Sequence, residues 1–125
     1  MEWQEQWDVV VVGSGAGGLV AAITAAYNGQ KVLLVEKSDV FGGSSALSGG
    51  GLWIPNNHVS KKAGLQDSEE EALTYMEDVI EDKGPASTHE RKVAYIKNGS
   101  KMVSFLEKLG MQWIAAPLYP DYYPE

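Results

Sequence analysis

The sequence contains no cysteine and a single arginine, and these shortages exclude several kinds of site. Without cysteine the chain can form no disulfide, no zinc–thiolate centre and no thiol nucleophile. Ten basic residues stand against 17 acidic ones, for a net charge of −7. We therefore expect no nucleic-acid partner. The first residues have no basic segment, and no apolar run is long enough for a transmembrane segment. These features predict a cytoplasmic protein, with peripheral contact with a membrane as an open alternative.

The first third of the chain alternates between strand and helix patterns. The runs Trp7–Val12 and Lys31–Glu36 are rich in Val and Leu, and each predicts a buried parallel strand. The segment GLVAAITAAYN between them has the composition of a helix that packs closely on a sheet, and Asn28-Gly29 ends it. Residues 7–36 therefore predict one β-α-β unit of an α/β fold.

The turn between the first strand and the helix carries G-x-G-x-x-G at Gly13, Gly15 and Gly18. Gly13 permits a tight turn, Gly15 lets the backbone approach a pyrophosphate, and Gly18 lets the helix lie close to the strand. Glu36 ends the second strand, where it can accept a hydrogen bond from a ribose 2′-hydroxyl. This order of features predicts dinucleotide binding. The alternative, a structural turn in an unrelated α/β fold, leaves Glu36 unexplained.

A second stretch of small residues follows the second strand. Nine of the ten residues from Gly42 to Gly51 are Gly, Ser or Ala. The pattern resembles the flavin loop of FAD-binding oxidoreductases of the fumarate reductase and succinate dehydrogenase flavoprotein family. A long, flat cofactor needs a backbone without bulky side chains, and its phosphates and ribityl hydroxyls suit serine hydroxyls and N–H groups. We expect FAD at residues 41–54. A mobile Gly/Ser linker is the alternative.

Residues 67–110 predict a helical segment. Ser68 and Glu71 form a capping box, Ser87 predicts a second helix start, and Ser100 predicts the cap of a third helix. Residues 111–125 form a proline-rich tail that is expected to lead toward a substrate site. Two strands are too few for a doubly wound sheet. The 125 residues are therefore expected to be the N-terminal part of a Rossmann-like FAD-binding domain, followed by helices and incomplete by itself.

Two further motifs, SSALSGGGLWIPNN and PDYYPE, are similar to FAD-dependent 3-ketosteroid dehydrogenases of the 3-oxosteroid 1-dehydrogenase type. The resemblance implies 1,2-desaturation of a small apolar ketone, a 3-keto steroid, with hydride transfer to FAD and an external electron acceptor. It also implies that Tyr122 is a catalytic residue, which supports a second tyrosine that removes a substrate proton and lies outside these 125 residues. The 125-residue chain alone is expected to be inactive.

Two alternatives stay open at this point. One is another fumarate reductase-type flavoprotein, an ene-reductase that acts on a small unsaturated acid. The other is a truncated fragment that binds nucleotide weakly or not at all and catalyses nothing. No metal site is predicted, because His58 and His89 lack partners at ligand spacing. The candidate cofactor-binding residues are Gly13, Ser14, Gly15, Ala16, Gly17, Gly18, Glu36, Lys37, Gly42, Gly43, Ser44, Ser45, Ala46, Ser48, Gly49 and Gly50.

Overall fold

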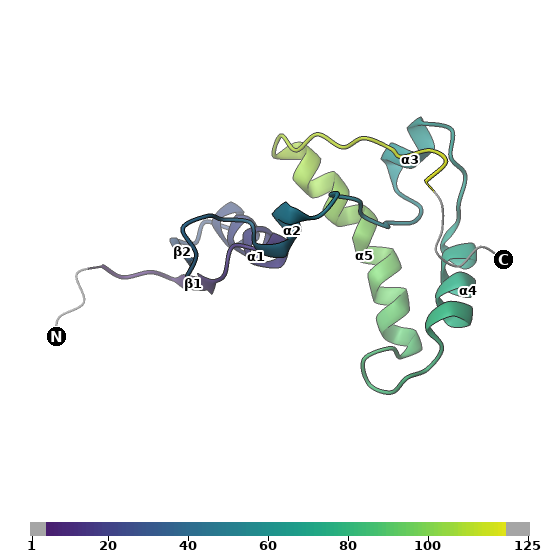
Figure 1. Ribbon diagram of the computed structural model, residues 1–125, viewed down its shortest axis with the longest axis horizontal. Coiled ribbons are helices and arrows are strands. Elements are labelled where there is room, and N and C mark those ends of the chain that lie inside the picture. The colour runs from purple at the N-terminus through teal and green to yellow at the C-terminus, as the bar shows by residue number, and fades with distance from the viewer. Residues whose placement is uncertain (1–4, 120–125) are drawn as a thin grey trace. The chain divides into compact units, whose positions relative to one another are not determined.

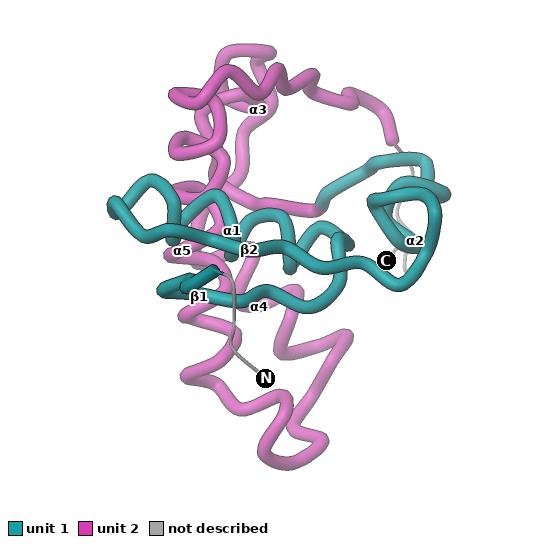
Figure 2. Tube along the Cα trace, turned by 90° about the vertical axis from the view of Figure 1, so that its left-hand side faces the viewer, with its two compact units in different colours: residues 1–52 teal, residues 53–125 magenta. Residues whose placement is uncertain are grey.

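The computed structural model describes residues 5–119, and the chain divides into two compact units. Unit 1 comprises residues 1–52 and unit 2 comprises residues 53–125 (Figure 2). Unit 1 contains both strands and the first two helices, whereas unit 2 is helical (Figure 1). Each unit is described by itself below.

Unit 1 is built on a parallel pair of strands, β1 (Val9–Val12) and β2 (Val32–Val35). Val9 pairs with Val32 and Val12 with Val35. Helix α1 (Ala16–Tyr27) connects the strands and contacts both of them. The predicted β-α-β unit is therefore confirmed.

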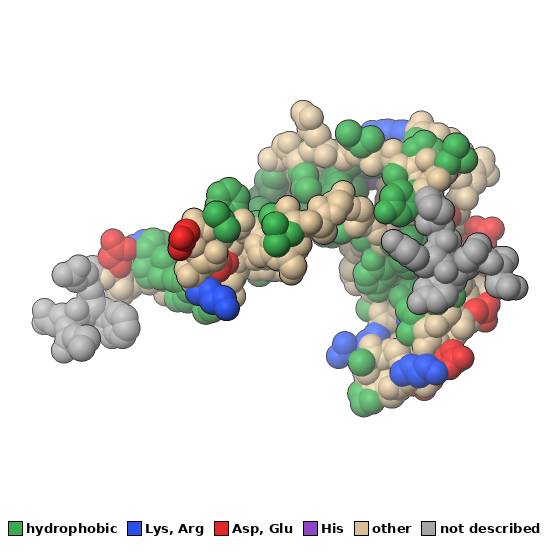
Figure 3. Space-filling view, in the orientation of Figure 1, with side chains coloured by type: hydrophobic (Ala, Val, Ile, Leu, Met, Phe, Trp, Pro, Cys, Tyr) green, Lys and Arg blue, Asp and Glu red, His purple; other side chains and the backbone are tan. Residues whose placement is uncertain are grey.

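Both strands are shorter than predicted. Just before the paired residues, the Lys31 N–H donates to the Asp8 carboxylate at 2.7 Å. This N–H therefore has a side-chain acceptor instead of a backbone carbonyl of the neighbouring strand. The expected burial is also wrong, since Val12 is 82% exposed. Within residues 5–119 the sheet has only these two strands, and part of their apolar surface is left uncovered. Hydrophobic side chains accordingly lie at the surface of the molecule (Figure 3).

Gly18 is where α1 approaches β1 most closely. A Cβ atom on Gly18 would lie 2.0 Å from the Gly13 carbonyl oxygen and 3.5 Å from Cγ1 of Val11. No carbon atom fits at the first distance, so the helix can take this position only with glycine here. The close helix–strand packing predicted for Gly18 is confirmed.

We expect Gly18→Ala to destabilise the protein severely, because its methyl group would force α1 away from the turn after β1. Overpacking of this kind costs typically 1–3 kcal/mol and more where backbone must move. The matched control is Gly17→Ala, since a Cβ at Gly17 has open space and alanine favours a helix. Thermal denaturation of both variants should show a lower Tm for Gly18→Ala alone. Equal Tm values would contradict the role given to Gly18.

Unit 2 contains three helices among its described residues: α3 (His58–Lys62), α4 (Glu69–Ile80) and α5 (His89–Lys108). Helices α4 and α5 pack together around the buried side chains of Ala72, Met76 and Ile96. Ser68 caps α4 as predicted, and its hydroxyl accepts the Glu71 N–H at 3.1 Å. Helix α3 was not predicted from the sequence. Its cap is Asn57, whose side chain accepts the N–H groups of Val59 and Ser60.

Helix α5 is continuous where the sequence predicts two helices. Its cap is Thr88 instead of Ser87, and Ser100 lies in the helix interior. The Ser100 hydroxyl donates to the Asn56 carbonyl oxygen at 3.0 Å. At the preceding residue, a Cβ on Gly99 would lie 2.9 Å from Cγ2 of Ile54. Gly99 and Ser100 thus pack α5 against residues 54–56, and neither of them ends the helix.

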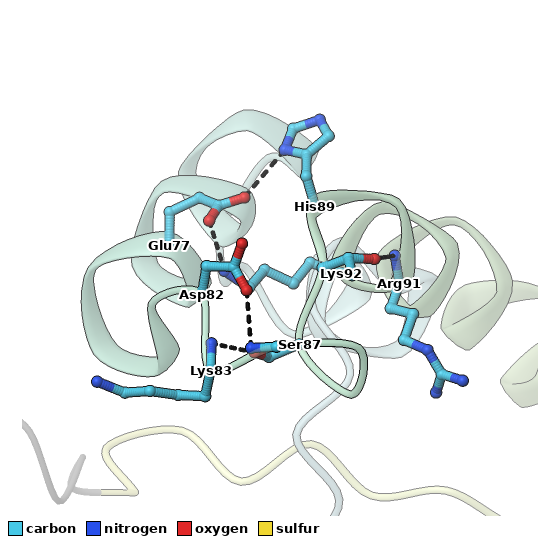
Figure 4. Close-up of polar contacts among 9 residues, drawn as sticks. Glu77, Asp82, Lys83, Ser87, His89, Arg91 and Lys92 are labelled. Carbon is cyan, nitrogen blue, oxygen red and sulfur yellow. Dashed lines mark hydrogen bonds and ion pairs between the residues drawn. The ribbon is translucent and has the colours of Figure 1, made fainter.

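An ion-pair cluster connects the end of α4 to the start of α5 (Figure 4). Glu77 accepts from Lys92 Nζ at 2.5 Å and pairs with His89 Nδ1 at 2.9 Å. Lys92 is only 2% exposed, so its charge requires this partner. The hydrogen bond from Lys92, and after it the one from His89, lowers the pKa of Glu77.

The remaining described residues, 111–119, contain no helix or strand. Trp113 fixes the start of this segment, because its indole Nε1–H donates to the Val103 carbonyl oxygen at 3.0 Å. No helix within residues 5–119 is both long enough and apolar enough to cross a membrane.

Candidate functional site

The turn after β1 places the start of α1 at the end of the sheet. Gly13 has φ of +94°, a left-handed conformation that glycine adopts without strain, and its N–H extends the ladder to the Val35 carbonyl at 2.7 Å. Gly15 precedes α1 and, as a glycine, has no side chain of its own to cap this helix. The N–H groups of a first helical turn have no partner within the helix and carry the positive end of its dipole. This end of α1 therefore suits an anion.

Ser14 connects this turn to the end of β2 and to the following loop. Its hydroxyl donates to Glu36 Oε2 at 2.6 Å, and its backbone N–H reaches the same oxygen at 2.9 Å. The hydroxyl also accepts the Gly42 N–H at 2.9 Å. Three segments that are distant in the sequence thus meet at one serine side chain.

Glu36 is held as an anion at the surface. The Ser14 hydroxyl, then the N–H groups of Ser14 and Ser38, lower the pKa of its carboxyl from 4.5 to about 2. Because the pKa is lower in the folded protein, these bonds contribute their full stabilisation above about pH 4.5. That contribution is lost as the pH falls toward 2 and the carboxylate takes up a proton.

The second glycine stretch folds into a short helix, α2 (Gly43–Leu47), beside the first turn. Gly42 and Gly43 have φ of +106° and +55°, and a Cβ on Gly43 would lie 3.5 Å from the Gly15 Cα. The Ser45 hydroxyl accepts the Ala16 N–H at 3.3 Å. The two glycine motifs are therefore in contact, although 29 positions separate Ser45 from Ala16.

All predicted cofactor-binding residues lie in unit 1. Hydrogen bonds join Ser14 to Glu36 and Gly42, and another joins Ser45 to Ala16. Ser48 links residues 45 and 50 of the loop, since its hydroxyl donates to the Ser45 carbonyl and accepts the Gly50 N–H. Four further predicted residues are exposed and accessible to a ligand: Lys37, Ser44, Ala46 and Gly49. Tyr122, the predicted catalytic residue, lies outside the described residues.

The arrangement fits a dinucleotide cofactor whose second half is long enough to lie along the glycine- and serine-rich loop. A Cβ on Gly15 would meet nothing within 4 Å, so open space lies beside the backbone where the sequence predicts a pyrophosphate. An anionic carboxylate stands at the end of β2, and a glycine- and serine-rich loop continues from it. The connecting role of Ser14 was not predicted, because G-x-G-x-x-G accepts any residue at that position. Within residues 5–119 no three His, Asp or Glu side chains gather as metal ligands do.

Known proteins are similar to this chain in sequence and in fold. The FAD binding domain family matches residues 8–118. A 3-oxosteroid 1-dehydrogenase of Mycobacterium tuberculosis is 48% identical over 97% of this chain, which corresponds to 21% of that protein. A 4-oxocyclohexanecarboxylate 2-dehydrogenase of Sinomonas cyclohexanicum is 44% identical over 93% of the chain and 20% of its own length.

One solved structure extends the similarity to three dimensions. It is a 3-ketosteroid Δ1-dehydrogenase from Sterolibacterium denitrificans in complex with 1,4-androstadiene-3,17-dione. It is 43% identical, with a TM-score of 0.72 over 82% of this chain and 17% of its own. The chain thus spans about a fifth of the length of the curated relatives it matches.

Proposed function

The chain belongs to the FAD binding domain family, and from this premise we propose that it forms the FAD-binding front of a flavin-dependent dehydrogenase that desaturates a 3-keto steroid next to its ketone. The observation that carries the proposal is the contact between the two glycine motifs at Ser14 and Gly42, beside an anionic Glu36. A site for NAD alone needs the first motif and the acid, and the second motif matches the additional length of FAD. The proposed desaturation is supported by the names of two relatives, a 3-oxosteroid 1-dehydrogenase and a 4-oxocyclohexanecarboxylate 2-dehydrogenase.

The described residues would hold FAD from its adenosine end toward its flavin end. Glu36 would accept a hydrogen bond from the adenosine ribose, and the start of α1 at Gly15 would face the pyrophosphate. The loop from Gly42 to Gly50 would follow the ribityl chain with serine hydroxyls and N–H groups. Bound FAD supplies the hydride acceptor for the reaction.

The chain's own proposed part in the chemistry is Tyr122. Removal of a proton beside a ketone by a tyrosinate requires a lowered tyrosine pKa, since a free tyrosine has a pKa near 10. A hydrogen bond donated to the phenolate by Tyr122 would stabilise the charged form and lower that pKa. The base itself and the groups that polarise the ketone are proposed to lie outside residues 1–125.

Absorbance and turnover of the full-length protein test the proposal in two steps. The purified protein should show flavin absorbance, and it should desaturate a 3-keto steroid with an artificial electron acceptor while leaving urocanate and fumarate unreduced. A flavoprotein that reduces an unsaturated acid and ignores steroids would indicate an ene-reductase. A colourless protein that takes up no added FAD would contradict the entire proposal. A cytoplasmic location, with peripheral contact with a membrane as the open alternative, stays a prediction of the sequence, which identifies no particular electron acceptor.

Glu36→Ala should weaken FAD binding roughly ten- to a hundredfold, because a hydrogen bond to a charged group is lost at the ribose. Titration of the flavin-free full-length protein, followed by flavin fluorescence, measures the dissociation constant. Asp39→Ala is the matched control, since Asp39 is an exposed acid three residues further along the chain. Equal affinity of the Glu36→Ala variant and the wild type would make Glu36 a structural acid only.

A further inference from the structure

Ser14 is completely buried, at 0% exposure, in a turn whose neighbouring glycines are only half-buried. A serine side chain gains little from apolar burial, so its hydrogen bonds are the reason for its position. It donates to Glu36, which follows β2, and accepts from Gly42, near the start of the flavin loop. The flavin loop is defined here as residues 41–54.

The two oxygens of the Glu36 carboxylate have different partners. Oε2 accepts both the Ser14 hydroxyl and the Ser14 N–H, at 2.6 and 2.9 Å. Oε1 accepts the Ser38 N–H at 3.0 Å. A carboxylate oxygen offers about two acceptor positions. Ser14 therefore fills Oε2, and Oε1 keeps a position for a ligand on an exposed residue.

We propose that Ser14 is a positioning residue for FAD: by filling Oε2 it orients Oε1 of Glu36 toward the adenosine 2′-hydroxyl. The inference rests on the proposed function, because it takes FAD as the ligand. Ser14 acts on the adenosine end through Glu36, which is the group that would touch the ribose.

The electrostatics of Glu36 support this role. Hydroxyl and backbone N–H groups keep the pKa of its carboxyl low, and the Ser14 hydroxyl contributes most. The groups facing the carboxylate are Ser14 from the turn after β1, with Lys37 and Ser38 from the segment after β2. Lys37 acts there through its backbone N–H. An acceptor that stays ionised and fixed in orientation loses little freedom when it binds a ribose hydroxyl.

An experiment that combines one substitution with one cofactor analogue, on the plan of a double-mutant cycle, distinguishes a positioning role of Ser14 from a merely structural one. The full-length protein and its Ser14→Ala variant are each titrated with FAD and with FAD that lacks the adenosine 2′-hydroxyl. Ser14→Ala should weaken FAD binding about tenfold, but should weaken binding of the analogue less than about twofold, because the contact that it orients is absent. Ser38→Ala is the matched control: its backbone N–H still bonds Oε1, so both affinities should match the wild type.

Each outcome decides the inference. Equal fold-losses for FAD and the analogue, or no loss for either, would overturn it while leaving FAD binding intact. Failure of the wild type to bind FAD would instead overturn the proposed function, and the inference with it. If Ser14→Ala does not fold, Ser14→Thr keeps the hydroxyl and should keep the wild-type ratio of the two affinities. A folded Ser14→Thr variant that loses this ratio would also overturn the inference.

Discussion

Gly15→Val is expected to yield a full-length protein that is folded but colourless. Gly15 has φ of −64° and ψ of 172°, which valine adopts readily, and its Cβ would enter open space. The free protein should therefore tolerate the substitution. The isopropyl group would occupy the position from which the backbone approaches the pyrophosphate, so FAD binding should be abolished.

Two measurements check this result. The ratio of flavin to protein absorbance should fall to zero, while circular dichroism and Tm match those of the wild type freed of flavin. Ala21→Val is the matched control, because it adds the same side chain at an exposed position of α1. A normal flavin ratio in the Gly15→Val variant would show that the pyrophosphate does not lie at this turn.

Tyr122→Phe is expected to lower turnover of a 3-keto steroid by about 10²–10⁴-fold, the range for a compromised acid–base step. The substitution keeps the ring and removes one hydroxyl, so flavin content should not change. Substrate affinity should change much less than turnover, since the lost hydrogen bond strengthens as the base tyrosine becomes charged. Steady-state kinetics of the full-length protein measure both quantities.

The pH dependence of turnover is an independent test, because the direction of its shift can be predicted. Loss of a hydrogen bond to the phenolate raises the pKa of the base tyrosine. The limb of the pH profile that reports its deprotonation should therefore move to higher pH in the Tyr122→Phe variant. Tyr123→Phe removes the neighbouring hydroxyl and serves as the control, with rates expected near those of the wild type. Superimposable profiles for Tyr122→Phe and wild type would remove Tyr122 from the proposed mechanism.

Local rules were sufficient where a residue acts on neighbours that are close to it in the sequence. G-x-G-x-x-G predicted the turn at Gly13 and the close packing at Gly18, and both are present. Ser68 predicted its helix start, because a capping hydroxyl bonds an N–H only three residues away. Such features depend on neighbours in the sequence, so one sequence is enough to find them.

The same rules failed where distant segments compete for a residue. Ser100 has the type of a helix cap, but it lies inside α5 because residues 55 and 56 offer carbonyl oxygens to its hydroxyl. The neighbouring Gly99 also lies inside α5, where it makes room for Ile54. A single-sequence pattern contains no information about which carbonyl or side chain will arrive from 45 positions away.

The sequence by itself determined the β-α-β unit, the glycine turn and the acid at the end of β2, because periodicity and motif spacing act over short distances. The FAD-binding family came from the resemblance of the sequence to known flavoproteins. The tertiary structure alone decided that Ser14 fills one oxygen of Glu36 and holds Gly42, and that the flavin loop lies against the first turn. Those contacts join residues 22 and 28 positions apart. They form only when the parallel pairing of β1 and β2 brings the carboxyl ends of both strands to the same edge.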